Sequence, residues 1–215
     1  MSGRVVFGQN PVIHKAQGAG IDIDPSSPAP GWADILGLIK PDPLGANAPT
    51  LGTYEGNVRG YHYTATDKID MWFHIPHDYA PGTDLYFHLH WSHNGTDISG
   101  SFIIDYAVNY AKGHNQANFT TPVTPQQTIS TPDIATVPQR RHRIDEFQLS
   151  ASSPSATQID TDNIEPDGII MANLTVNTIP TITGGTTEPF IHTLDIHYQT
   201  TGIKGTKQRA PDFWT

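Results

Sequence analysis

The chain has 215 residues, a net charge of −9, 15% charged residues and no cysteine. The lack of cysteine excludes disulfides and thiolate metal sites. An acidic chain with few lysines and arginines also lacks the basic surface that nucleic-acid binding needs. No stretch approaches the roughly 20 apolar residues of a membrane span, and the N-terminus has no apolar segment typical of a signal peptide. We therefore expect neither a nucleic-acid nor a membrane partner, and a chain made in the cytoplasm.

The N-terminal quarter differs in composition from the rest. Prolines and glycines recur in residues 25–32 and 40–52, with little alternation of polar and apolar residues. This composition predicts an extended arm over residues 1–55, with one short helical turn at residues 32–38. The arm also carries apolar side chains that would be poorly placed in water: Trp32, Ile35, Leu36 and Leu38. These side chains dock either on a neighbouring subunit or back on their own domain, and the sequence favours neither strongly.

From about residue 61 onward the apolar residues alternate with polar ones. Residues 69–75, 85–91 and 101–111 each place large apolar side chains on one face, which predicts three strands. Turn signals such as Pro81-Gly82 and Asn94-Gly95 separate them. We expect these strands to pair as an antiparallel meander.

The sequence after residue 111 predicts further strands joined by loops. A stretch rich in threonine, glutamine and proline predicts an edge strand near residues 126–131, because prolines avoid central strands. Further strands are predicted at residues 140–150, 169–178 and 190–199. The last strand places His192, Leu194, Ile196 and Tyr198 on one side, with Asp195 and His197 on the other. Seven or eight strands without a long helix predict an all-β, jelly-roll-like antiparallel β-sandwich over residues 56–215.

Histidines form the main candidate for a site. Five fall within twenty residues: His74, His77, His88, His90 and His93. His88 and His90 stand two apart in a strand, so both imidazoles project from one face, roughly 7 Å apart. Neutral imidazole suits zinc, nickel, copper or iron, and His197 is the predicted third ligand, with Asp195 on the same face. A structural metal ion is thus the one cofactor considered. The alternative is that the histidines form hydrogen bonds within the chain or line a subunit interface.

Enzyme signatures are incomplete. Gly82, His88 and His90 match the beginning of the cupin motif, but Asn94 or Gly95 stands where a cupin has glutamate, and the second cupin motif is missing. There is no nucleophile motif or P-loop either. We therefore predict no catalytic residue, and a metal-dependent cupin-like enzyme is only a second alternative.

An aromatic residue on a polar strand face offers another kind of site. Trp72 shares its face with Asp70 and His74, whereas Trp91 falls on the apolar face. A tryptophan among polar groups can stack on a sugar ring. Trp72 is therefore the candidate glycan contact.

Several segments resemble a family of structural proteins of tailed bacteriophages. They are GWADILG (31–37), HIPHDYAPGTDLYFHLHWSHNGT (74–96), DYAVNYAKGHNQANF (105–119) and LDIHYQTTGIKGTKQRAPDFW (194–214). The resemblance implies a virion component. We expect a capsid decoration (cement) protein on the capsid exterior, homotrimeric, whose partners are the major capsid protein and copies of itself. A tail, collar or fibre-associated component with a glycan- or receptor-binding role is the alternative.

Overall fold

The computed structural model describes residues 31–37, 40–41 and 47–200. Within these ranges there is no α-helix, only two short 3-10 turns, η1 (Ile134–Thr136) and η2 (Thr161–Asn163). The strands are β1 (Gly31–Leu36), β2 (Lys40–Pro41), β3 (Thr50–Glu55), β4 (Val58–His62), β5 (Lys68–His74), β6 (Tyr86–Ser92), β7 (Asp97–Ser99), β8 (Ser101–Ala111), β9 (Gln126–Ser130), β10 (Arg143–Gln148), β11 (Ser150–Ala151), β12 (Ile159–Asp160), β13 (Ile169–Thr178), β14 (Thr181–Thr183) and β15 (Phe190–Thr200). No helix among the described residues is long and apolar enough to cross a membrane.

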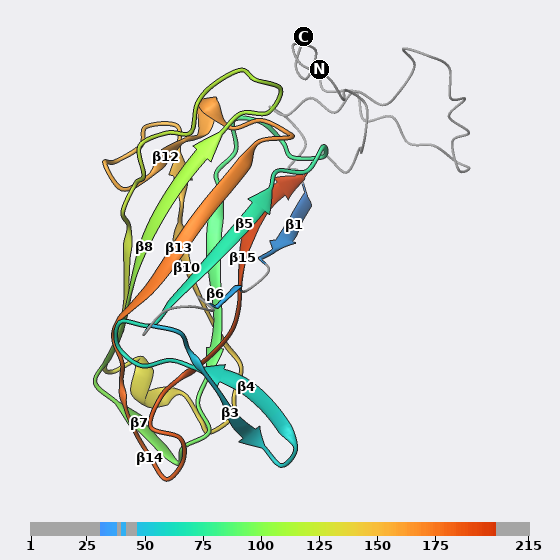
Figure 1. Cartoon of the computed structure of the whole chain (residues 1–215). Helices are drawn as coiled ribbons and strands as arrows, with labels where there is room; N and C mark the ends of the chain where they lie inside the picture. The colour runs from blue at the N-terminus through green and yellow to red at the C-terminus, as the bar shows by residue number, and fades with distance from the viewer. Residues whose placement is uncertain (1–30, 38–39, 42–46, 201–215) are drawn as a thin grey trace, which may run out of the picture.

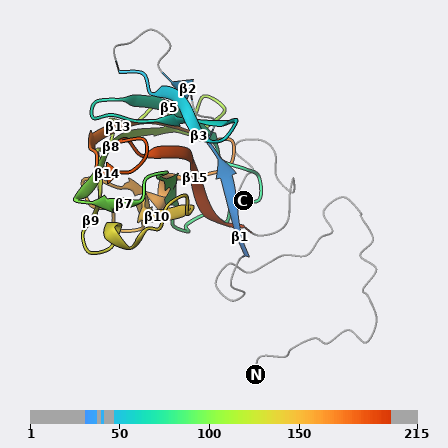
Figure 2. The ribbon, with the colours of Figure 1, turned by 90° about the horizontal axis from the view of Figure 1, so that it is seen from below.

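Two antiparallel sheets face each other as a β-sandwich (Figures 1 and 2). The first, called sheet A, has the order β10-β6-β15-β4-β3, with β1 also paired to β15. The second, sheet B, has the order β2-β5-β13-β8-β9. A small β7–β14 ribbon lies at one end of the sandwich, and the β3–β4 hairpin projects near it (Figure 1). The predicted all-β sandwich is confirmed.

The core lies between the sheets and follows the period of two. Every second residue of β5, β6, β8 and β13 is buried, while its neighbours face outward. The largest fully buried side chains include Trp91, Tyr63 and Phe87. Because successive strand side chains point to opposite faces, each sheet also presents an outer face of polar side chains. Those two outer faces carry the candidate sites.

The predicted strand positions agree with the structure, but their pairing does not. The strands expected at 69–75, 85–91 and 101–111 are β5, β6 and β8, and the edge strand near 126–131 is β9, which ends sheet B. The predicted meander is wrong, because β5 and β8 belong to sheet B, where both pair with β13, whereas β6 belongs to sheet A. The loops between these strands cross from one sheet to the other.

The prediction for the N-terminal arm is wrong in its described part. Gly31–Leu36 form strand β1, antiparallel to β15, rather than a helical turn. The β3 strand pairs with β4 within sheet A, so residues 50–55 belong to the sandwich. Residues 1–30 and Leu38 lie outside the described residues. The backbone N–H and C=O groups of β1 find their hydrogen-bond partners on the edge of β15. In a helical turn, the same groups would have to pair within the segment itself.

Some apolar side chains of the arm pack on the arm's own domain, and others are exposed to solvent. Ile35 is half-buried and packs against the core, which matches docking on the arm's own domain. Trp32 and Leu36 are exposed, with 49% and 70% of their surface accessible. Among the described residues of the arm, neighbour contact therefore remains a proposal for Trp32 and Leu36.

Candidate functional site

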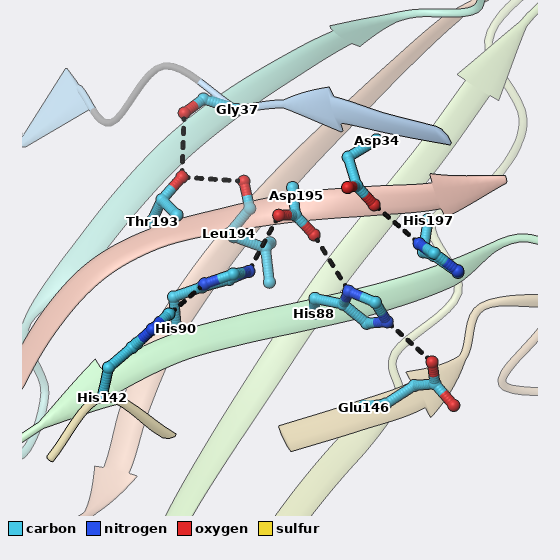
Figure 3. Close-up of polar contacts among 10 residues, drawn as sticks. All are labelled: Asp34, Gly37, His88, His90, His142, Glu146, Thr193, Leu194, Asp195 and His197. Atoms are coloured by element: carbon cyan, nitrogen blue, oxygen red, sulfur yellow. Dashed lines mark hydrogen bonds and ion pairs between the residues drawn. The ribbon is translucent and has the colours of Figure 1, made fainter. Parts of the chain in front are cut away.

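The strand register of sheet A brings polar side chains from distant parts of the sequence into one row on its outer face. His88 on β6 is the cross-strand partner of Asp195 on β15 and of Glu146 on β10. His90 follows two residues later on the same face. In Figure 3, the Asp195 carboxylate lies between the rings of His88 and His90. Directly opposite residues in a sheet have Cβ atoms about 5 Å apart, so these side chains interact directly.

Asp195 is a buried carboxylate held between two imidazoles. Its side chain is 4% exposed, its Oδ2 lies 2.8 Å from His90 Nε2, and its Oδ1 lies 3.4 Å from His88 Nδ1. Neither contact has the geometry of a hydrogen bond, so among the described residues Asp195 Oδ1 and His90 Nε2 are both buried without a hydrogen-bond partner. Burial is the largest cause that raises the pKa of the Asp195 carboxyl above its ordinary value, and the neighbouring His90 acts against it. The inner side of the site therefore holds two buried unsatisfied atoms, one on Asp195 and one on His90.

The outer ring nitrogens of both histidines are occupied. His88 Nε2 lies 2.6 Å from Glu146 Oε2, and His90 Nδ1 lies 2.8 Å from His142 Nε2. A carboxylate acceptor places the proton of His88 on Nε2, which leaves Nδ1 as a lone pair facing Asp195. The outer contacts thereby orient both rings.

His197 belongs to an adjoining part of the same face. Its Nδ1 pairs with Asp34 Oδ1 on β1 at 2.6 Å, and its ring stacks between Trp32 (4.5 Å between centroids) and His88 (4.6 Å). The interplanar angle with Trp32 is 9°. Strand β1 thus extends the polar face with one carboxylate and one exposed aromatic ring.

A β-bulge adds a further histidine. The register of β15 against β6 shifts between Ile191 and Thr193, so His192 turns outward and its Nε2 lies 2.7 Å from Ser92 Oγ. The prediction that His192 shares a face with Leu194, Ile196 and Tyr198 is therefore wrong for His192, because the extra residue interrupts the alternation. Burial first, and then the charges of His142 and His90, lower the pKa of His192 below its ordinary value.

The structure keeps the predicted ligands close but divides them into two groups. Among the described residues, ligand atoms lie within 4.8 Å of one another in the group His88, His90 and Asp195, and in the group Asp34, His88 and His197. His88 is common to both, whereas His90 and His197 fall in different groups. Asp195, which the sequence placed on the right face, joins the two paired histidines.

The other histidines of the cluster lie elsewhere. His74 and His77 contact Asp167 Oδ1 at 3.2 and 3.1 Å, and His114 contacts its Oδ2 at 2.9 Å. They surround this carboxylate without forming a close group of ligand atoms with it. His93 is fully buried, and its Nε2 contacts the Val137 carbonyl oxygen at 2.9 Å. For His93, the interpretation as a hydrogen-bonded structural histidine holds.

The outer face of sheet B carries a different kind of surface. Trp72 on β5 is 56% exposed, and its cross-strand partner is Met171 on β13. Along the same face runs a surface hollow of about 400 Å³ lined by Asp105, Tyr106, Ala107, Thr124, Pro125, Gln126, Asn173 and Thr175. Asn173 pairs across the sheet with Asp70, two residues from Trp72. The exposed Trp72 ring and a hollow lined in part by the amides of Gln126 and Asn173 therefore lie on the same face of sheet B.

The polar groups around this hollow are fixed by one another. Gln126 Nε2 donates to Asp105 Oδ1 at 2.6 Å, and Asn177 Nδ2 donates to Asp105 Oδ2 at 2.6 Å. Asn173 Nδ2 donates to Asp70 Oδ1 at 2.8 Å, and its Oδ1 accepts from Thr175 at 3.0 Å. Each side chain keeps further donor or acceptor capacity for a ligand.

Comparisons with known proteins give little. No family model and no curated protein matches this chain. Similar solved structures include a CBM4 protein (8% identity, TM-score 0.30, covering 83% of this chain and 89% of the other). Another is a family 11 carbohydrate-binding module from Clostridium thermocellum, with 11% identity and a TM-score of 0.30, covering 81% of this chain and 92% of the other. A third is TmCBM61 in complex with β-1,4-galactotriose, with 10% identity and a TM-score of 0.26, covering 81% of this chain and 92% of the other. Identities and TM-scores this low carry no argument, so the proposals below rest on this chain's own residues.

Proposed function

We propose that this β-sandwich is a non-catalytic glycan-binding protein whose binding surface is the outer face of sheet B. The observation that carries the proposal is the position of the exposed Trp72 on the same sheet face as this hollow. Its exposed ring offers the flat apolar surface on which the C–H face of a sugar stacks. Amide, hydroxyl and carboxylate groups lie where hydroxyls of the next sugar unit reach them.

The chemistry of the hollow fits a neutral polysaccharide. Asp105, Gln126, Asn173 and Thr175 supply both acceptors and donors, which hydroxyl groups need because each hydroxyl donates and accepts. The hydrogen bonds of Gln126 to Asp105 and of Asn173 to Asp70 hold these groups in place before the ligand binds, which limits the ordering cost on binding. The open, shallow shape suits a chain that lies along the sheet.

We expect Trp72→Ala to weaken polysaccharide binding by about tenfold or more, because a single buried aromatic contact commonly contributes over 1.4 kcal/mol to binding. The measurement is isothermal titration calorimetry or affinity electrophoresis with host surface polysaccharides and with a panel of neutral β-glucans and galactans. Trp32→Ala is the matched control, since it removes an equally exposed tryptophan from the opposite sheet. The proposal would be refuted if Trp72→Ala bound polysaccharide as tightly as the wild type. It would also be refuted if the wild type bound none of these polysaccharides.

We also propose that the protein is a component of a bacteriophage virion, with capsid decoration as its role and the capsid exterior as its location. The resemblance of the four segments to tailed-phage structural proteins supports this proposal. One structural observation favours a docking surface on sheet A, where Trp32, Leu36 and Ile144 are all about half exposed or more. The occupant would be the major capsid protein or a second copy of the chain in a homotrimer.

Capsid docking through this face predicts that Leu36→Asp reduces co-sedimentation with capsids lacking the protein by about tenfold, because a charge replaces an apolar contact at the interface. Val58→Asp is the control, since Val58 is 62% exposed on the projecting β3–β4 hairpin. Analytical ultracentrifugation of the same samples gives the oligomeric state. If Leu36→Asp sediments with capsids as the wild type does, this face does not contact the capsid.

A further inference from the structure

We propose that His88, His90 and Asp195 form a binding site for one divalent transition-metal ion on the outer face of sheet A, independent of the glycan surface on sheet B. The ligand atoms are His88 Nδ1, His90 Nε2 and a carboxylate oxygen of Asp195. Three observations carry this inference: the unsatisfied inner atoms, the occupied outer nitrogens, and the spacing of the ligand atoms.

The inner atoms need a cation between them. His88 Nδ1 carries a lone pair, since its other nitrogen pairs with Glu146 at 2.6 Å. When His90 donates Nδ1–H to His142 Nε2, its Nε2 is a second lone pair. Both lone pairs then face the carboxylate of Asp195, so three acceptors surround one point. Buried acceptors without a donor are costly, and a metal ion satisfies all three at once.

The outer contacts match those of ligating histidines. A metal-bound histidine commonly gives its remaining N–H to a carboxylate or another acceptor, which fixes the ring orientation. Glu146 has that position behind His88, and His142 has it behind His90 (Figure 3). Glu146 and His142 are therefore positioning residues, and neither contacts the ion.

The spacing fits bonds to a small cation. Ligand atoms about 2.0 Å from a tetrahedral ion lie roughly 3.3 Å apart. Asp195 oxygens lie 2.8 Å from His90 Nε2 and 3.4 Å from His88 Nδ1. The rings of His88 and His90 are 6.3 Å apart and tilted by 52°, which lets their in-plane lone pairs converge.

The second group, Asp34, His88 and His197, is the poorer site. The rings of His88 and His197 stack with 24° between their planes, so their lone pairs run side by side instead of converging. Asp34 is half exposed and already paired with His197 Nδ1. A carboxylate and imidazole that satisfy each other need no ion.

The donor set selects the class of ion. Two imidazoles and one carboxylate suit zinc, cobalt, nickel or iron, whereas calcium and magnesium prefer all-oxygen sites. Three protein ligands leave the remaining positions to water. The proposed ligand is therefore a first-row transition-metal ion, with zinc as the probe of choice.

The test is a titration of the untagged, full-length, chelator-treated protein with Zn²⁺, followed by calorimetry and elemental analysis. A parallel titration with Co²⁺ reads out the ligand geometry from its visible absorption. We expect one ion per chain, with no comparable binding of Ca²⁺ or Mg²⁺. Asp195→Asn should abolish the stoichiometric site, and Glu146→Gln should weaken it by about 10- to 100-fold, as loss of an outer partner does.

Asp167→Asn is the matched control, because Asp167 also contacts three histidines but forms no close group of ligand atoms with them. It should bind Zn²⁺ as the wild type does. His90→Gln reports on the same site if Asp195→Asn fails to fold, which circular dichroism reveals. A wild-type protein that binds no stoichiometric Zn²⁺, or binding that survives both Asp195→Asn and His90→Gln, would overturn the inference.

Discussion

Trp91→Ala should lower the free energy of unfolding by about 4 kcal/mol, because truncating a large buried aromatic leaves a cavity and loses its transfer energy. Trp91 is fully buried, and its ring meets Phe102 edge-on at 5.2 Å. Its Nε1 donates to Asp145 Oδ2 at 2.6 Å, so the substitution also removes a donor from a largely buried carboxylate. Urea denaturation followed by circular dichroism measures the change.

Trp91→Phe separates the two contributions. It keeps most of the apolar volume but loses the indole N–H, so we expect a smaller loss, of about 1–2 kcal/mol. Trp72→Ala makes the same truncation at an exposed position and should change stability by about 0.5 kcal/mol or less. A Trp91→Ala loss no greater than that of Trp72→Ala would show that Trp91 does not anchor the core.

The alternation of apolar residues predicted where strands lie, but not which sheet each joins. Ile69, Phe87 and Phe102 occupy the same phase of the same pattern, yet their strands divide between two sheets. A buried face looks alike in either layer, since both pack against the same core. Sheet membership depends on pairing between distant segments, which a local pattern does not contain.

The candidate metal site was predictable in its parts and not in its grouping. The spacing of residues along the strands predicts that His88 and His90 share one face. It also predicts that Asp195 lies on the strand face that points away from the core. That Asp195 completes the group depends on the register of β15 against β6 and on the bulge at Ile191–Thr193, and a register is set by contacts across the whole sheet. The bulge also explains why His192 was placed on the wrong side.

Strand β1 shows how a neighbour overrides local pattern. The sequence predicts a short helical turn at residues 32–38 within an extended arm. In the structure, Ala33 and Ile35 pack inward and Asp34 meets His197. The open edge of β15 offers backbone hydrogen bonds to a strand, and tertiary contacts of this kind commonly outweigh short-range propensity.

Gly37→Ala should detach β1 from the sandwich and lower stability by about 1–3 kcal/mol, the range typical of overpacking. A Cβ on Gly37 would lie 2.5 Å from the Leu194 carbonyl oxygen and 2.7 Å from the ring of Phe73. Neither neighbour can yield easily, because one is strand backbone and the other is 1% exposed core. The Gly37 N–H to Leu194 O hydrogen bond, 3.0 Å long, would be lost as the chain moves away.

Detachment has a readout beyond stability, because β1 carries Asp34 and Trp32 to His197. Limited proteolysis should cut Gly37→Ala within residues 31–37 at low protease concentrations. Gly31→Ala is the control, since its Cβ would meet only Thr200 Cγ2 at an ordinary 3.6 Å and should leave β1 in place. Equal stability and equal protease resistance in the two variants would mean that β1 does not depend on the close approach of Gly37 to β15.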